Sequence, residues 1–143
     1  MGLTASIVSA LDAKLTDATS SRTLNVPVSK AWPSYDNPAL VRPSAAIAWR
    51  ADEQLETPYP PRLGGGTKWR TEFDVGLFCQ DEPRLHTYVD AARACMTGWH
   101  FDTIGGVAMD IKAGRIERIP QGETTIEALR YAAQWIITFE YTR

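Results

Sequence analysis

Apolar residues recur at every fourth position near the start of the chain. The members of this series are Leu3, Ile7, Leu11 and Leu15. A period close to 3.6 residues places such side chains on one face of an amphipathic helix. The spacing therefore predicts a helix over residues 3–18, with charged side chains on its outer side.

A second helical pattern starts after residue 80. Asp81 precedes it and is a suitable N-cap, because its carboxylate can accept a hydrogen bond from a free backbone N–H. Pro83 occupies an early helical position, where its missing N–H costs little. We expect Gly98 to end the helix. The apolar stripe of this helix comprises Leu85, Tyr88, Val89, Ala92, Cys95, Met96 and Trp99.

Residues 68–80 alternate between apolar and polar side chains. This period of two is typical of a strand with one buried face. Arg70 and Glu72 lie on the exposed face, on which Phe78 is the apolar exception. The expected core face consists of Trp69, Thr71, Phe73, Val75, Leu77 and Cys79.

Further strands are predicted on both sides of this one. Residues 24–28 form a short strand at a sheet edge, because Pro27 cannot donate a ladder hydrogen bond. Other strands are expected over residues 44–50 and 128–143. Residues 107–119 alternate as well and are predicted to form a hairpin that turns at Ala113–Gly114.

The segment 51–67 shows neither helical nor strand periodicity. It contains three prolines and three consecutive glycines. A loop of this length is unusual in a compact domain and is often functional or mobile. We expect a long flexible loop or hairpin here.

These elements predict an α+β fold. Half-polar strands indicate a mainly antiparallel or mixed β-sheet with one exposed face. Two apolar helical stripes are enough to cover the other face, which gives a two-layer domain with two α-helices packed on one face. The whole chain, residues 1–143, is expected to be this single domain.

Composition supports a folded core and limits the classes of partner. The chain has 143 residues, of which 44% are hydrophobic, and a formal net charge of −2. This charge argues against general binding of polyanions by counterion release. Cys79 and Cys95 are expected to be reduced, buried thiols, which indicates a reducing, cytosolic origin. No apolar run is long enough to cross a bilayer, and the first 21 residues lack the pattern of a signal peptide.

The sequence offers no constellation typical of an active site. His86 and His100 are 14 positions apart, which matches no metal-ligand spacing. Residues 64–68, Gly-Gly-Gly-Thr-Lys, lack the order of a phosphate-binding loop, and a strand rather than a helix follows them. We therefore expect no catalytic residue, no cofactor and no metal, and we do not expect an enzyme.

Arginine and aromatic residues are interleaved around the long loop. Eleven of the fifteen basic residues are arginine, and the chain has five tryptophans. Arg and Trp are enriched in protein interfaces, although the same mixture can stack on single-stranded nucleic acid, and a merely solvated surface is a further alternative. The candidate interface consists of Trp49, Arg50, Tyr59, Arg62, Lys68, Trp69 and Arg70.

The pattern and order of these segments resemble the tail terminator (tail completion) proteins of long-tailed bacteriophages. Three segments carry the resemblance: the N-terminal helix Leu-Thr-Ala-Ser-Ile-Val-Ser-Ala-Leu, the strand at 70–78 that runs into an acidic turn and a helix, and the closing strand at 134–141. The resemblance spans most of the chain.

The resemblance implies a structural virion protein. Its members form a ring, hexameric in the expected case, that caps the completed tail tube, stops its polymerisation and provides the surface for head–tail joining. The implied partners are other copies of the chain, the major tail tube protein and a head-side connector or stopper, with DNA passing through the centre and no membrane. The implied location is the virion neck, and the host cytoplasm during assembly.

Two alternatives remain at this point. One is another neck protein, either a head-side stopper or a connector adaptor. The other is a single-stranded nucleic-acid binding module that uses Tyr59, Trp69 and Arg70.

Overall fold

The computed structural model describes residues 2–16, 28–30, 44–55, 66–119 and 131–143. Two helices and six strands form in this part of the chain, and the predicted α+β class is confirmed. In chain order the elements are α1 (Leu3–Leu15), β1 (Val28–Ser29), β2 (Ser44–Gln54), β3 (Lys68–Cys79), α2 (Glu82–Met96), β4 (Phe101–Ile104), β5 (Val107–Ile119) and β6 (Tyr131–Thr142).

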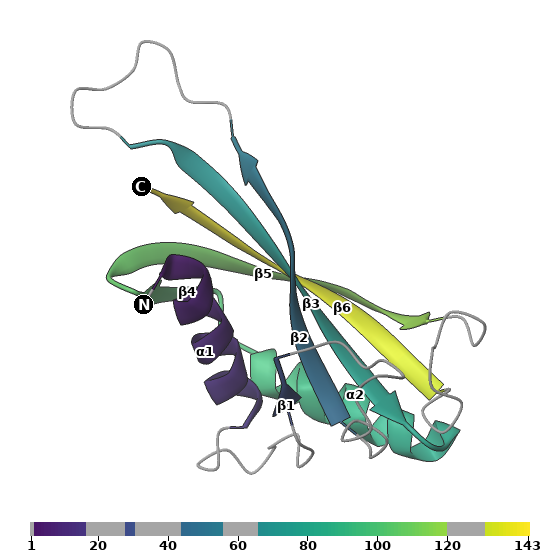
Figure 1. Ribbon diagram of the computed structural model, residues 1–143. Coiled ribbons are helices and arrows are strands. Elements are labelled where there is room, and N and C mark those ends of the chain that lie inside the picture. The colour runs from purple at the N-terminus through teal and green to yellow at the C-terminus, as the bar shows by residue number, and fades with distance from the viewer. Residues whose placement is uncertain (1, 17–27, 31–43, 56–65, 120–130) are drawn as a thin grey trace.

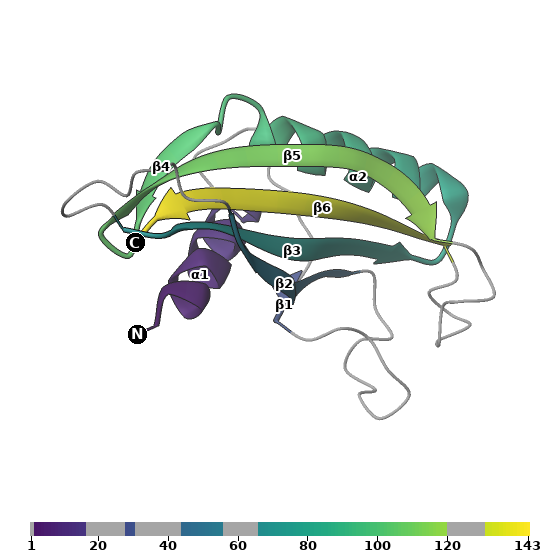
Figure 2. The same cartoon turned by 90° about the horizontal axis from the view of Figure 1, so that it is seen from above.

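The six strands form one mixed sheet in the order β1-β2-β3-β6-β5-β4. Only β1 pairs in parallel, with β2, and every other pair of neighbours is antiparallel. The sheet is strongly twisted, and both helices lie beneath it in Figure 1. Figure 2 looks onto the opposite face, which we call the helix-free face.

The predicted core face of β3 is confirmed from Thr71 to Cys79, whereas Trp69, the first residue of that predicted face, is only half-buried. Its odd-numbered residues from Thr71 to Cys79 are buried, and most of them join one apolar cluster with residues of both helices. Phe73 and Phe139 pack edge to face with ring centroids 5.9 Å apart, and Trp99 contacts Phe139 at the same distance. This alternation assigns the even-numbered residues of β3 to the helix-free face.

Both helices follow the sequence pattern closely. In α1 the buried residues are Ile7, Leu11 and Leu15, and the helix ends at Leu15 rather than at the predicted residue 18. The carboxylate of Asp81 accepts a hydrogen bond from the Arg84 backbone N–H at 2.9 Å, as expected of an N-cap. These interactions fix α2 directly after the end of β3.

The prediction of a hairpin within residues 107–119 is wrong. This segment is the single strand β5, and the actual hairpin joins β4 to β5 through Gly105 and Gly106. Both glycines have positive φ, +60° and +78°. A two-residue hairpin turn of this kind requires positive φ at both central residues, and glycine adopts such angles easily. Gly114, predicted as the turn, lies instead in an irregularity of the β5–β6 pairing.

The predicted loop at 51–67 starts and ends inside regular structure. Residues 51–54 continue β2, and Thr67 exchanges two backbone hydrogen bonds of 2.9 Å with Arg143. Residues 56–65 lie outside the described part of the chain, as do residues 24–27 of the predicted edge strand. The edge position itself is confirmed at Val28, which pairs with Ala45 at the margin of the sheet.

Candidate interaction surface

Four charged residues lie in one row across the helix-free face. The strand register aligns Glu53 on β2 with Arg70 on β3, Arg70 with Glu140 on β6, and Glu140 with Asp110 on β5. Cross-strand neighbours on one face are close enough for their side chains to interact. The strands therefore bring residues from distant parts of the sequence into one polar cluster.

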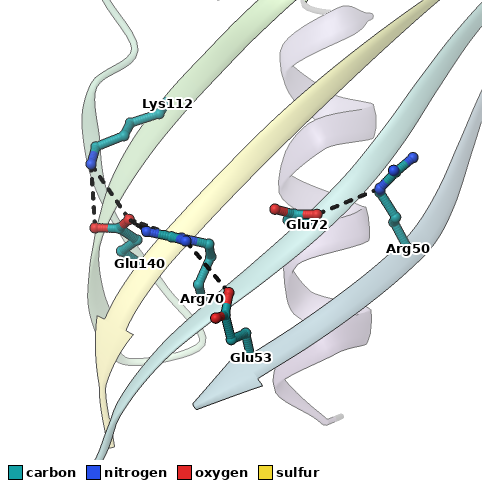
Figure 3. Close-up of polar contacts among 6 residues, drawn as sticks. All are labelled: Arg50, Glu53, Arg70, Glu72, Lys112 and Glu140. Carbon is teal, nitrogen blue, oxygen red and sulfur yellow. Dashed lines mark hydrogen bonds and ion pairs between the residues drawn. The ribbon is translucent and has the colours of Figure 1, made fainter. Parts of the chain in front are cut away.

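Glu140 is the buried centre of this cluster, with 8% of its side chain exposed. The Nε and Nη2 groups of Arg70 both donate to its Oε1 atom, at 3.1 and 3.0 Å. Lys112 Nζ lies 3.4 Å from both carboxylate oxygens. Figure 3 shows the carboxylate held between the two cations.

These contacts determine the charge state of the pair. The hydrogen bond from Arg70 holds the pKa of the Glu140 carboxyl below its ordinary value of 4.5, although burial acts in the opposite direction. The same hydrogen bond raises the pKa of the Arg70 guanidinium. Arg70 also contacts Glu53 at 3.4 Å, so this guanidinium lies between two carboxylates.

Arg50 forms a second ionic cluster on the same face. The register of β2 and β3 shifts between Trp49 and Ala51, so Arg50 is an extra residue in a β-bulge. Its Nε atom lies 3.5 Å from Glu72, and its Nη1 atom lies 3.4 Å from Asp74. The bulge thus directs this arginine onto the carboxylates of the neighbouring strand, and Figure 3 shows its contact with Glu72.

The two tryptophans of the predicted interface lie on the other face of the sheet. The register aligns Trp49 with the core residue Phe73, and Trp69 with Tyr141. Trp69 is half-buried, whereas Trp49 is 55% exposed and donates from Nε1 to Asp52 Oδ1 at 3.2 Å.

The sheet therefore divides the predicted interface residues between two surfaces. Arg50, Lys68 and Arg70 belong to the helix-free face, and the two tryptophans belong to the helix side. Tyr59 and Arg62 lie outside the described residues.

Three further residues that contribute to these two faces were not predicted from the sequence. Glu140 and Lys112 complete the Arg70 cluster, and Phe101, on edge strand β4, is 63% exposed. A lone carboxylate inside the apolar segment Ile-Ile-Thr-Phe-Glu-Tyr was the signal for Glu140. The partners of that carboxylate became visible only through the strand register.

Comparison with protein-family models and with curated protein sequences gave no match for this chain. The fold and the surface chemistry are therefore the basis for any proposal about function.

Carboxylates outnumber cations on the described part of the helix-free face. The arginines are engaged with carboxylates, so this surface offers no excess positive charge to a phosphate backbone. Its cations are Arg50, Lys68, Arg70 and Lys112, and its carboxylates are Glu53, Glu72, Asp74, Asp110, Glu117 and Glu140.

Cys79 and Cys95 are both buried and free of disulfide bonds, as predicted, and burial raises the pKa of the Cys79 thiol. His86 contacts Glu82 at 3.1 Å on the exposed side of α2. Among the described residues, no three His, Cys, Asp or Glu side chains group to hold a metal ion, and no helix is long and apolar enough to span a membrane.

Proposed function

We propose that this protein is a structural subunit of a bacteriophage neck. In this role several copies form a ring that caps the tail tube and presents a surface for joining the head. The ring has no catalytic activity, takes no cofactor and lets DNA pass through its centre.

The observation that carries the proposal is the exposed indole of Trp49 on β2. Trp49 is 55% exposed on the helix side of the sheet, and its Nε1 atom donates a hydrogen bond to the exposed carboxylate of Asp52 on the same side. A solvent-facing tryptophan beside an exposed carboxylate is typical of an interface with a hydrophobic anchor and a polar rim. The core does not require these side chains, so contact with another chain is the simplest use for them.

The arrangement of elements adds support. The segments that resemble tail terminators correspond to α1, to β3 with α2, and to β6. Two helices on one face of an open sheet favour this function over a head-side stopper or connector adaptor, for which a small barrel or a helical bundle is more typical.

Binding of single-stranded nucleic acid is the weaker candidate. Arg70 is already paired with Glu140 and Glu53, and Trp69 lies on the opposite face of the sheet from it. A stacking groove needs aromatic rings and free cations along one track. This arrangement separates the two.

The proposal is tested by measuring the particle mass with light scattering and by negative-stain microscopy. The purified chain is examined alone over a range of concentrations and mixed with tail tubes of the phage that encodes it. We expect ring particles with a mass of several times the 15.9 kDa subunit, six times in the expected case. A monomer under all these conditions contradicts the proposal. Salt-dependent binding of a fluorescent oligonucleotide that is lost in Trp69→Ala would support the nucleic-acid alternative instead.

A further inference from the structure

An open groove lies between α2 and the bulged part of β5. It has a volume of about 450 Å³. Met96, Ile116 and Trp135 provide apolar lining, and Met96 and Trp135 are nearly buried. Arg93 and Arg115 are the charged residues among those that line it. The groove therefore combines an apolar floor with two cations at its margin.

The β5 bulge shapes one wall of this groove. The register passes from Ala113–Ile137 to Ile116–Trp135, so Gly114 and Arg115 lie opposite the single residue Ile136, and β5 carries one extra residue there. The Gly114 carbonyl accepts a hydrogen bond from Trp135 Nε1 at 2.6 Å, which holds the indole beneath the bulge. A side chain at Gly114 would approach the Ile136 carbonyl oxygen to 3.1 Å, which is a reason for glycine at this position.

Trp49 lies on β2, past the residues that pair with β1, and in the same row as this groove on β5; among the described residues, β2 and β5 are the outermost strands of that row. The register aligns Trp49 with Phe73, Phe73 with Ile137, and Ile137 with Ala113, which lines the groove. All four positions are on the helix side of the sheet. The exposed Trp49 side chain and the open groove thus lie at the two ends of one cross-strand row, on the same face of the sheet.

The charges of the two edges are complementary. Asp52 lies beside Trp49 and is exposed, and its carboxylate accepts a hydrogen bond from the indole. Arg93 and Arg115 have side chains that are 64% and 86% exposed, and each has one neighbouring carboxylate, Asp90 and Glu117 respectively. Ion pairs this exposed are weak, so either arginine can engage a further carboxylate at little cost.

We infer that Trp49 and Asp52 of one copy dock in the α2–β5 groove of the next copy. The indole packs on Met96, Ile116 and Trp135, and the carboxylate lies at Arg93 and Arg115. Two different surfaces of one chain then meet, which is a head-to-tail contact. Because both surfaces occupy one row, neighbouring copies are related mainly by rotation, and rotation without a large shift along the strands closes a ring.

This inference rests on the proposed ring and adds the contact that joins its subunits. It is tested with the charge-reversal variants Asp52→Arg and Arg115→Asp, the double variant, and Trp49→Ala. Glu53→Arg is the matched control, because this neighbour of Asp52 is also exposed but lies on the helix-free face. Light scattering gives the concentration at which each variant assembles.

We expect Trp49→Ala and each single charge reversal to raise the concentration needed for assembly at least about tenfold. The double reversal should recover most of that loss. The control Glu53→Arg should assemble like the wild type. Unchanged thermal melting of the dilute monomers shows that each variant still folds. If the wild type forms rings and the variants form them equally well, the inferred contact is wrong, but the proposed ring function still stands. If the wild type never assembles, both proposals fail.

Cysteine cross-linking tests the same contact directly. The native cysteines are buried, so new ones at the surface can be oxidised selectively. A chain that carries both Asp52→Cys and Arg115→Cys is expected to give a ladder of covalent oligomers under mild oxidation. A chain that carries only one of the two changes is expected to give no ladder. Absence of a ladder from assembled rings overturns the inference.

Discussion

Arg70 and Glu140, seventy positions apart in the sequence, are paired across β3 and β6 by two hydrogen bonds from one guanidinium to one carboxylate oxygen. The carboxylate is almost fully buried, and Lys112 closes its other side. This pair also fixes the alignment of the two central strands, because a slip by one residue would place Glu140 on the apolar side of the sheet.

Replacing Glu140 with Gln should reduce the free energy of unfolding by about 1–2 kcal/mol at neutral pH, since hydrogen bonds to charged groups are worth more than neutral ones. The lower part of that range is expected because the Arg70 side chain is 35% exposed and can be hydrated. Urea unfolding followed by tryptophan fluorescence measures the difference.

The effect of Glu140→Gln should depend on pH with a definite sign. The pKa of Glu140 in the folded chain is below the ordinary value of 4.5, so its contribution is fully present above the unfolded pKa. That contribution declines as the pH falls through the folded pKa. The curves of stability against pH for the two proteins should therefore converge in acid, and a constant difference down to low pH would contradict this explanation.

Glu53→Gln serves as a matched control, because Glu53 contacts the same guanidinium but its side chain is 63% exposed. Ion pairs of this kind contribute little. We expect a loss of less than about 0.5 kcal/mol, measured under the same conditions. An equal loss in both variants would mean that burial is not what distinguishes the two carboxylates.

Phe73→Ala should lower the free energy of unfolding by about 3–5 kcal/mol, because it removes a fully buried ring and leaves a cavity against Phe139. Phe101→Ala changes the same residue type at a position that is 63% exposed, and we expect less than about 1 kcal/mol there. Denaturant unfolding of both variants gives the comparison. A loss under about 1 kcal/mol in Phe73→Ala would show that the core face of β3 is wrongly assigned.

Asp81→Ala should cost about 1 kcal/mol, because the Arg84 backbone N–H loses its side-chain acceptor at the start of α2. Asp81→Asn keeps a capping oxygen and should retain most of the stability. Thermal melting distinguishes the two variants. Equal melting temperatures for the alanine and asparagine forms would indicate that the cap does not stabilise the domain.

Cys79 should resist alkylation in the folded protein, because its thiol is buried and burial raises its pKa above the ordinary 9.0, which leaves little thiolate at neutral pH. Mass spectrometry after a short iodoacetamide pulse is expected to show no labelling at either cysteine in buffer and labelling at both in urea. Rapid labelling of Cys79 in buffer would mean that the C-terminal end of β3 opens readily.

The periodic elements could be predicted because each of them has a buried face. The four-residue spacing of α1 and the alternation of β3 result from contact with one apolar core, so the pattern in the sequence reports that contact. Residues 51–54 belong to β2 but were predicted as loop, because they lack such a buried face. This end of the strand rises away from the helix, so neither of its sides needs a continuous apolar row.

The wrong prediction of a hairpin within β5 has a different cause. Gly114 lies within an alternating segment, and glycine there is compatible with either a turn or a bulge. Gly105 and Gly106 were the better turn candidates, because both central residues of such a turn need positive φ and Ala113 would be strained there. The register with β6 then shows that the chain continues through the bulge as one strand.

The sequence by itself determined the α+β class, the two helices, the N-cap at Asp81 and the core face of the central strand. These features depend on neighbours in the sequence and on the period of burial. Only the tertiary structure decided that Arg70 pairs with Glu140, that the tryptophans and arginines of the predicted interface lie on opposite faces, and that Trp49 shares a row with the α2–β5 groove. Strand order, register and bulges bring those residues together across long sequence separations, and such pairings leave no local period in the chain.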